Sequence, residues 1–173
     1  IGATGTLTGT YPLVIYQQPG VGNSANLIAW YNFENNLLDT SGYGNDLVFQ
    51  TGTQLFNTTI KKLGGYSLQF DATATYYVTA NYISTPRVNG ITFAIWFYST
   101  AAYTYHPLFT LYQSGTYYIR AGRNSSANSA ISLTISGSST ATWVSPGINY
   151  FADSTWHHLV WCISSTGVWT VYI

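Results

Sequence analysis

The chain has 173 residues, which fits one domain with a substantial buried core. Charged residues make up only 6% of it and five basic residues balance five acidic ones, so no field exists to attract nucleic acid or an anionic membrane. No apolar run reaches the roughly 18 residues of a membrane-spanning helix, while aromatic residues reach 17%, a composition typical of a secreted or particle-surface (virion or cell-surface) β protein.

Residues 1–26 differ from the rest of the chain. Residues 1–10 are rich in Gly and Thr, residues 11–17 (YPLVIYQ) predict a short strand, and residues 18–24 gather Pro, Gly and Asn. We interpret 1–26 as an N-terminal arm or linker with one short strand, which could add to the sheet edge of a neighbour. An ordinary edge strand of the same domain is an equal alternative, and the domain proper is expected at 27–173.

From Leu27 onward, short runs of β-branched and aromatic residues alternate with turn residues. The runs that predict strands are 27–33, 46–51, 66–70, 76–80, 91–99, 108–113, 116–121, 131–136, 142–144, 156–164 and 168–173. Along residues 91–99 the side chains on both faces of the strand are largely apolar, which predicts a central strand covered on both faces. Along residues 66–70 the apolar side chains lie on one face, which predicts a strand with one buried face. No amphipathic helix is indicated, and helical turns are expected only in loops such as 57–63. The pattern favours an antiparallel β-sandwich.

Three features bear on covalent chemistry. The single cysteine, Cys162, excludes an intrachain disulfide and is expected to be a buried small hydrophobe. Asn57 and Asn124 each begin an Asn-x-Ser/Thr sequence, which makes them candidate glycosylation sites, although chance matches are expected in a chain so rich in Asn, Ser and Thr.

The order of the motifs resembles the laminin-G-like, concanavalin-A-like jelly-roll superfamily of lectins and glucanases. The blocks that carry the resemblance are Leu27–Asp46, Gly65–Asp71 (GYSLQFD), Ile91–Phe97 (ITFAIWF), Trp156–Val160 (WHHLV) and Val171–Ile173 (VYI). It implies an antiparallel two-sheet β-sandwich over 27–173. Family members usually continue into closing strands, whereas this sequence stops at Ile173. The expected jelly roll therefore lacks its C-terminal closing strands, which either follow in a longer chain or come from another chain.

Glycoside hydrolysis usually requires two carboxylates flanking the bond. Glucanases of the superfamily that this chain resembles carry their catalytic carboxylates as a Glu-x-Asp-x-x-Glu series on one strand. This chain has one glutamate and four aspartates, and no two of them stand at i, i+2 or i, i+4 on a predicted strand. We therefore expect no enzymatic activity, with a hydrolase using Glu34 and Asp71 as the distant alternative.

An acid and amide cluster follows the strand at 27–33. The oxygen donors that calcium would take are Glu34, Asn36, Asp39, Asn45 and Asp46, all within thirteen positions. Members of the superfamily that this chain resembles often hold calcium near such loops. The favoured interpretation is that Asp39 and Ser41 satisfy loop N–H groups while Gly42 and Gly44 supply unusual dihedral angles. No cofactor is therefore expected, with Ca²⁺ as the alternative.

Aromatic rings and amide groups provide a possible carbohydrate site, because sugars stack their apolar faces on aromatic rings. The predicted sugar-binding residues are Tyr103, Tyr105, His106, Tyr117, Trp143 and Tyr150. Trp96, Trp156 and Trp161 are expected in the core instead. His157 and His158 are adjacent on a predicted strand and point to opposite faces, so they cannot clamp one metal ion together.

The leading prediction is a non-enzymatic, lectin-like β-sandwich that acts in surface binding or assembly, as a structural component of an extracellular or virion-type particle, coat or filament. Low charge, the N-terminal arm and the unclosed C-terminus favour it. The alternative, which the resemblance favours, is a carbohydrate-binding or adhesion module, either with or without a dependence on calcium. The expected partners are protein neighbours in an assembly, or glycans.

Overall fold

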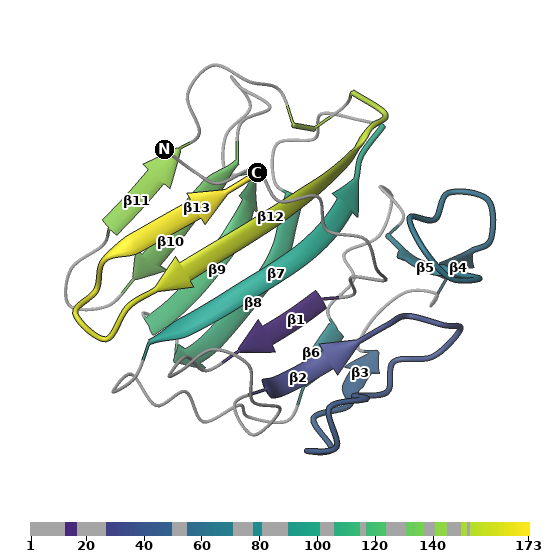
Figure 1. Ribbon diagram of the computed structural model, residues 1–173, viewed down its shortest axis with the longest axis horizontal. Helices are drawn as coiled ribbons and strands as arrows, with labels where there is room; N and C mark the ends of the chain where they lie inside the picture. The colour runs from purple at the N-terminus through teal and green to yellow at the C-terminus, as the bar shows by residue number, and fades with distance from the viewer. Residues whose placement is uncertain are drawn as a thin grey trace. The chain divides into compact units, whose positions relative to one another are not determined.

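The computed structural model is all-β in the residues that it describes. These are 13–16, 27–49, 55–70, 78–80, 90–100, 106–114, 117–123, 131–136, 141–144, 150–151 and 153–173. Within these ranges the chain forms several small antiparallel sheets and no helix, so no described helix could cross a membrane (Figure 1). The face-to-face packing of two sheets stays a prediction from the sequence.

The largest sheet has five strands in the order β13-β12-β7-β1-β2 (Figure 1). Their bounds are Trp169–Tyr172, Trp156–Ile163, Ile91–Tyr98, Leu13–Tyr16 and Leu27–Tyr31, respectively. The predicted central position of β7 is confirmed, although its buried residues, Ile91, Phe93 and Phe97, all lie in one row and the other row is half-buried. β12 and β13 join through a tight turn, in which Gly167 has φ +79° and donates its N–H to the Ser164 carbonyl at 3.0 Å.

β1 lies inside this sheet rather than at its edge. Val14 stands opposite Trp30 of β2 on one side and opposite Ala94 of β7 on the other. The predicted short strand is thus present and is not an edge strand, whereas the arm or linker at 1–26 stays a prediction. Its extended residues, Leu-Val-Ile-Tyr, have the high β propensity of a strand paired on both sides.

A four-stranded sheet has the order β11-β10-β9-β8. Its strands are β8 (His106–Ser114), β9 (Tyr117–Arg123), β10 (Ser132–Ser136) and β11 (Ala141–Val144). Ser114 pairs with Tyr117 across a two-residue connection, so β8 and β9 form a hairpin. Ala121 and Leu133 are opposite each other and fully buried.

Two short pairs complete the described structure. β3 (Leu47–Phe49) pairs with β6 (Val78–Ala80), and β4 (Leu55–Asn57) pairs with β5 (Ser67–Gln69). β4 was not predicted, and the loop expected to hold a helical turn at 57–63 has bends at 58–60 and 62–63 instead. The buried face expected for 66–70 is also absent, because Leu68 is only half-buried and Phe70 is exposed.

The chain divides into two compact units, residues 1–96 with 159–172, and residues 97–158 with 173. In the first unit the fully buried Trp161 packs against Phe93, with ring centroids 5.9 Å apart. In the second, Phe97 packs against Phe151 at 5.2 Å. Each such buried side chain stabilises the fold by about 1.5–3 kcal/mol.

The residues that were expected in the core differ in how deeply the structure buries them. Trp161 is fully buried as predicted, whereas Trp96 and Trp156 are half-buried. Cys162 is also only half-buried, and its Sγ accepts the Thr92 hydroxyl at 3.4 Å. The thiol therefore acts as a weak polar partner between two strands as well as a small hydrophobe.

Candidate functional site

Asp39 organises the turn that follows β2. Its Oδ1 accepts the backbone N–H groups of Trp30 at 2.9 Å and Ser41 at 2.8 Å. Its Oδ2 accepts the Ser41 hydroxyl at 2.7 Å and the Asn45 N–H at 3.0 Å. Burial alone would raise the pKa of Asp39, but these hydrogen bonds outweigh it and lower the pKa below its ordinary value. The predicted role of Asp39 and Ser41 in satisfying loop donors is confirmed.

The two glycines of this turn have the dihedral angles that the sequence predicts. Gly42 has φ +91° and Gly44 has φ +71°, the left-handed region that side chains disfavour. The turn is held further by Tyr31, whose hydroxyl donates to the Asn45 carbonyl at 2.6 Å. Burial raises the pKa of Tyr31, and the carboxylates of Asp39 and Asp46 add to that effect.

The same turn covers the outer edge of β2, whose other edge pairs with β1. The Ile28 carbonyl accepts the side-chain amide of Asn45 at 2.9 Å. The Trp30 carbonyl accepts the backbone N–H of Thr40 at 2.8 Å and its hydroxyl at 3.0 Å. Together with the bond from Trp30 N–H to Asp39, these contacts occupy backbone groups that an edge strand otherwise offers to another chain.

The residues predicted as calcium ligands have other partners in the structure. The Glu34 carboxylate accepts the Gly65 N–H at 3.1 and 3.0 Å, and the Asn36 side-chain amide donates to the Glu34 carbonyl at 2.8 Å. Asp46 Oδ1 accepts the Asp39 N–H at 2.8 Å. Across the described ranges no three His, Cys, Asp or Glu side chains form a group that could hold a metal ion. These contacts show how the predicted ligands shape the loop, and calcium binding there stays an alternative prediction.

Asp71, the proposed partner of Glu34 in the hydrolase alternative, lies outside the described residues. Glu34 itself is held against a glycine pair. A Cβ atom added to Gly64 would stand 1.6 Å from Glu34 Oε1, so only glycine leaves room for the carboxylate there. Gly64 also has φ +69°. Glu34 thus works as an anchor between the turn after β2 and the segment before β5.

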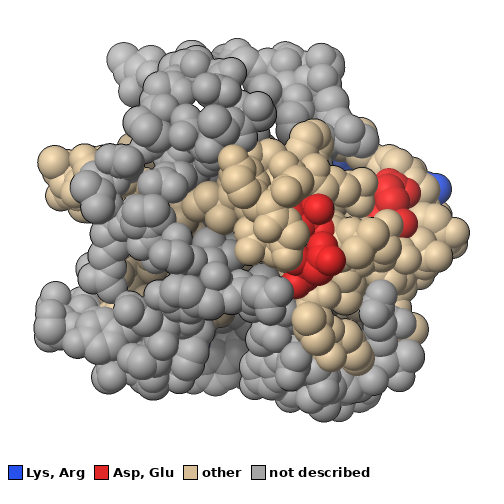
Figure 2. All heavy atoms as spheres, turned by 90° about the horizontal axis from the view of Figure 1, so that it is seen from below, with Lys and Arg blue, Asp and Glu red and all other residues tan. Residues whose placement is uncertain are grey.

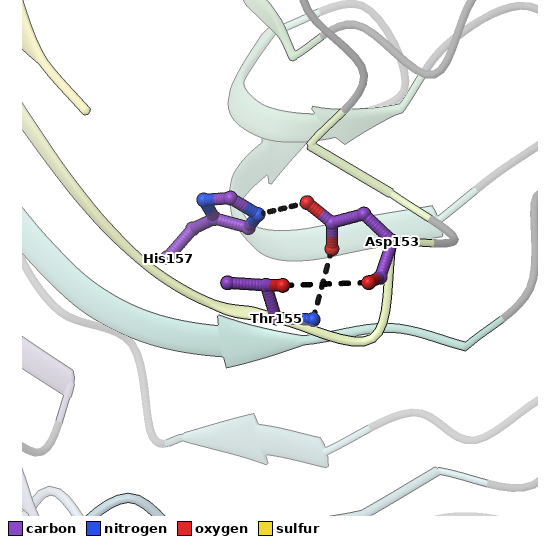
Figure 3. A network of polar contacts seen from close by, with 3 residues as sticks. All are labelled: Asp153, Thr155 and His157. Atoms are coloured by element: carbon purple, nitrogen blue, oxygen red, sulfur yellow. Dashed lines mark hydrogen bonds and ion pairs between the residues drawn. The ribbon is translucent and has the colours of Figure 1, made fainter.

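A second polar network lies at the start of β12, formed by Asp153, Thr155 and His157 (Figure 3). Asp153 Oδ2 is 2.6 Å from His157 Nε2, and Asp153 Oδ1 accepts the Thr155 N–H at 3.0 Å. The Thr155 hydroxyl donates to the Asp153 carbonyl at 3.3 Å. This Asx turn leads the chain into the strand, and Ser154 within it has φ +56°.

Aromatic rings surround this Asp153–His157 pair. The His157 ring lies 5.1 Å from the Tyr150 ring, edge to face, and 5.5 Å from the Phe97 ring. The side chains of His157 and Asp153 are 18% and 30% exposed, so an imidazole and a carboxylate reach solvent beside an aromatic ring. That combination can accept and donate hydrogen bonds to a hydroxylated ligand.

The pairing of Asp153 with His157 was not predicted, although the Asp-Ser-Thr sequence before a strand is a signal for an Asx turn. Of the predicted sugar-binding group the structure describes the side chain of Tyr150 alone. Tyr103 and Tyr105 lie outside the described residues. For the remaining three, His106, Tyr117 and Trp143, the structure describes only strand backbone, in β8, β9 and β11.

Asn57 ends β4 in a tight turn. Its side-chain amide donates to Gln69 Oε1 at 2.7 Å, and its Oδ1 accepts the N–H groups of Thr59 and Ile60 at 2.7 Å each. Residues 58–60 are exposed. Glycosylation at Asn57 stays a prediction, and Asn124 lies outside the described residues.

β13 is the other edge of the five-stranded sheet, and among the described strands it pairs with β12 alone. Val168 and Tyr172 are 62% and 51% exposed, and Thr170 between them is exposed as well. Residues 168–172 carry no Asp, Glu, Lys or Arg. On the face drawn in Figure 2, carboxylates gather in patches among uncharged described residues, and Lys or Arg atoms show toward the margin. An uncharged strand edge with exposed apolar side chains is a typical site of strand addition.

Comparisons of the chain with protein-family models, with curated proteins and with solved structures gave no significant match.

Proposed function

We propose that this chain is a non-enzymatic, lectin-like β-sandwich that acts in surface binding or assembly, as a structural component of an extracellular or virion-type particle. The observation that carries this proposal is the contrast between the two edges of the five-stranded sheet. The turn at Asp39 forms hydrogen bonds with the outward backbone groups of β2. By contrast, β13 pairs on one side within the described residues, and Tyr172 in it and Val168 directly before it are exposed.

The acidic side chains support the non-enzymatic part of the proposal. The carboxylates of Glu34, Asp39 and Asp46 accept backbone N–H groups, and that of Asp153 also pairs with His157. A carboxylate that already orders backbone donors is a poor general acid or nucleophile, because catalysis would break the loop that it holds.

Sedimentation velocity over a dilution series tests the proposal. We expect the weight-average sedimentation coefficient to rise with protein concentration, because association through a small strand edge is weak. A single monomeric species at every concentration would count against assembly. The same measurement in high salt is a control, since an uncharged interface predicts little change.

The second candidate function is carbohydrate binding, which the cluster of Tyr150, His157 and Asp153 favours. A glycan array with and without calcium tests it. If this cluster binds the sugar, Tyr150→Ala removes the signal and Tyr150→Phe, which keeps the ring, retains most of it. An array without hits counts against this candidate and leaves the assembly proposal standing.

A further inference from the structure

We propose that β13 pairs with β13 of a second copy of this chain, antiparallel and about a two-fold axis at Thr170, so that two five-stranded sheets become continuous. The inference rests on the proposed function in assembly and names its partner and register.

The backbone pattern fixes which groups of β13 point outward. Ser164 donates its N–H to the Val168 carbonyl at 2.9 Å, so these two residues form a hydrogen-bonded pair. Hydrogen-bonded pairs recur at every second residue of an antiparallel ladder, and Cys162 stands opposite Thr170. The N–H and C=O groups of Thr170 therefore face β12, and those of Trp169 and Val171 face the outer edge.

A two-fold axis at Thr170 uses those outward groups fully. Trp169 then exchanges hydrogen bonds with Val171 of the second copy, and Val171 with Trp169 of the second copy. Thr170 stands opposite its own equivalent, and Val168 stands opposite Tyr172. Threonine pairs and aromatic pairs with β-branched residues are among the favourable cross-strand pairs.

Charge permits this contact. The chain carries no charged residue from Leu159 to Ile173, so two copies of β12 and β13 can meet without opposing like charges or burying an unpaired one. Val168 and Tyr172, the two most exposed apolar side chains of this segment, would lose solvent contact together.

The covered edge of β2 explains why the partner strand is β13. A head-to-tail contact would need β13 of one copy to meet β2 of the next, but the Ile28 carbonyl and the Trp30 N–H and C=O are bonded to the turn at 39–45. Pairing of like edges closes after two copies, whereas head-to-tail pairing would continue into a filament.

Charge variants at the axis test the register. Thr170→Lys and Thr170→Glu each place like charges directly opposite each other in the symmetric dimer, so we expect both proteins to sediment as monomers. An equimolar mixture should recover the dimer, because Lys then stands opposite Glu. Leu38→Lys, at a site 55% exposed in the turn after β2, is the matched control and should remain dimeric.

A backbone variant tests the hydrogen bonds. Val171→Pro removes an outward N–H and spares the ladder to β12, so it should sediment as a monomer, whereas Val171→Thr keeps the N–H and should dimerise. Circular dichroism establishes that each variant is folded. Charge variants that dimerise alone, or a mixture that stays monomeric, overturn the β13 register while the proposed role in assembly survives. Wild-type protein that is monomeric at every concentration overturns both.

Discussion

Trp30 donates its backbone N–H to the carboxylate of Asp39 at 2.9 Å, although the two residues are nine positions apart. This contact ties an edge strand to the turn that follows it. Because the same carboxylate also accepts bonds from Ser41 and Asn45, it is the centre of the turn rather than one contact among several.

Asp39→Asn should destabilise the protein markedly. In Asp39→Asn an NH₂ group replaces one of the two carboxylate oxygens, so the N–H or O–H donors that this oxygen accepted lose their partner. Leaving such donors unsatisfied costs about 1–3 kcal/mol. Urea unfolding measures the difference in free energy. Asp46→Asn is the matched control, because its Oδ1 can still accept the Asp39 N–H, and it should cost clearly less. Equal losses in the two variants would contradict the central role of Asp39.

The contribution of Asp39 should disappear in acid. Its pKa in the folded protein lies below the ordinary value of 3.8, so the unfolded chain binds the proton first as the pH falls. The stabilisation by Asp39 is therefore complete above pH 3.8 and is lost as the pH falls through the pKa of Asp39 in the folded protein. We expect the free-energy difference between wild type and Asp39→Asn to shrink in that window, as measured by urea unfolding at successive pH values. A constant difference would contradict this linkage.

His158 should make stability depend on pH in a higher window. Burial lowers the pKa of His158 below its ordinary value of 6.5, so the folded protein keeps the imidazole neutral where the unfolded chain is already charged. Stability should thus fall as the pH falls from 6.5 through the folded pKa. His158→Gln should flatten the slope of unfolding free energy against pH in this range, and an unchanged slope would assign it to another group.

Gly64→Ala should cost more than Gly44→Ala. Both glycines have nearly the same φ, +69° and +71°, so both variants carry a similar backbone penalty of about 1–2 kcal/mol. A Cβ at Gly44 meets nothing within 4 Å, whereas one at Gly64 would overlap the Glu34 carboxylate.

The double variant Glu34→Ala with Gly64→Ala separates the steric contact from the backbone term. Once the Glu34 carboxylate is removed, Gly64→Ala should lower the free energy of unfolding only by as much as Gly44→Ala does. Thermal or urea unfolding of the four proteins provides the cycle. Strict additivity of the two substitutions would mean that Glu34 does not occupy the space above Gly64.

The strands were predictable where the sequence carries its own signal. β7 and β12 have long runs of β-branched and aromatic residues, and the central position of β7 follows from apolar residues on both rows. The turn at Asp39 was predictable in outline, because Asp, Ser and two glycines together dictate a tight loop. Its bonds to Ile28 and Trp30 were not, since they depend on the path that the chain takes after the turn.

Other features depend on contacts between distant residues. β4 has only Leu55, Phe56 and Asn57, and its pairing with β5 is what makes it a strand. The pairing of Asp153 with His157 depends on how the chain enters β12. The edge exposed at β13 depends on the order of the strands, which no local pattern encodes.

The internal position of β1 has a consequence for the order of folding. β1 and β2 can pair early, because Tyr16 and Leu27 are close in sequence, but Ile15 must wait for Phe93, and this contact closes a loop of about 80 residues. Such non-local pairing slows folding. On the ribosome, the edge of β1 that later pairs with β7 would therefore stay unpaired until β7 is synthesised. A polypeptide begun at residue 27 would have no strand to place between β7 and β2.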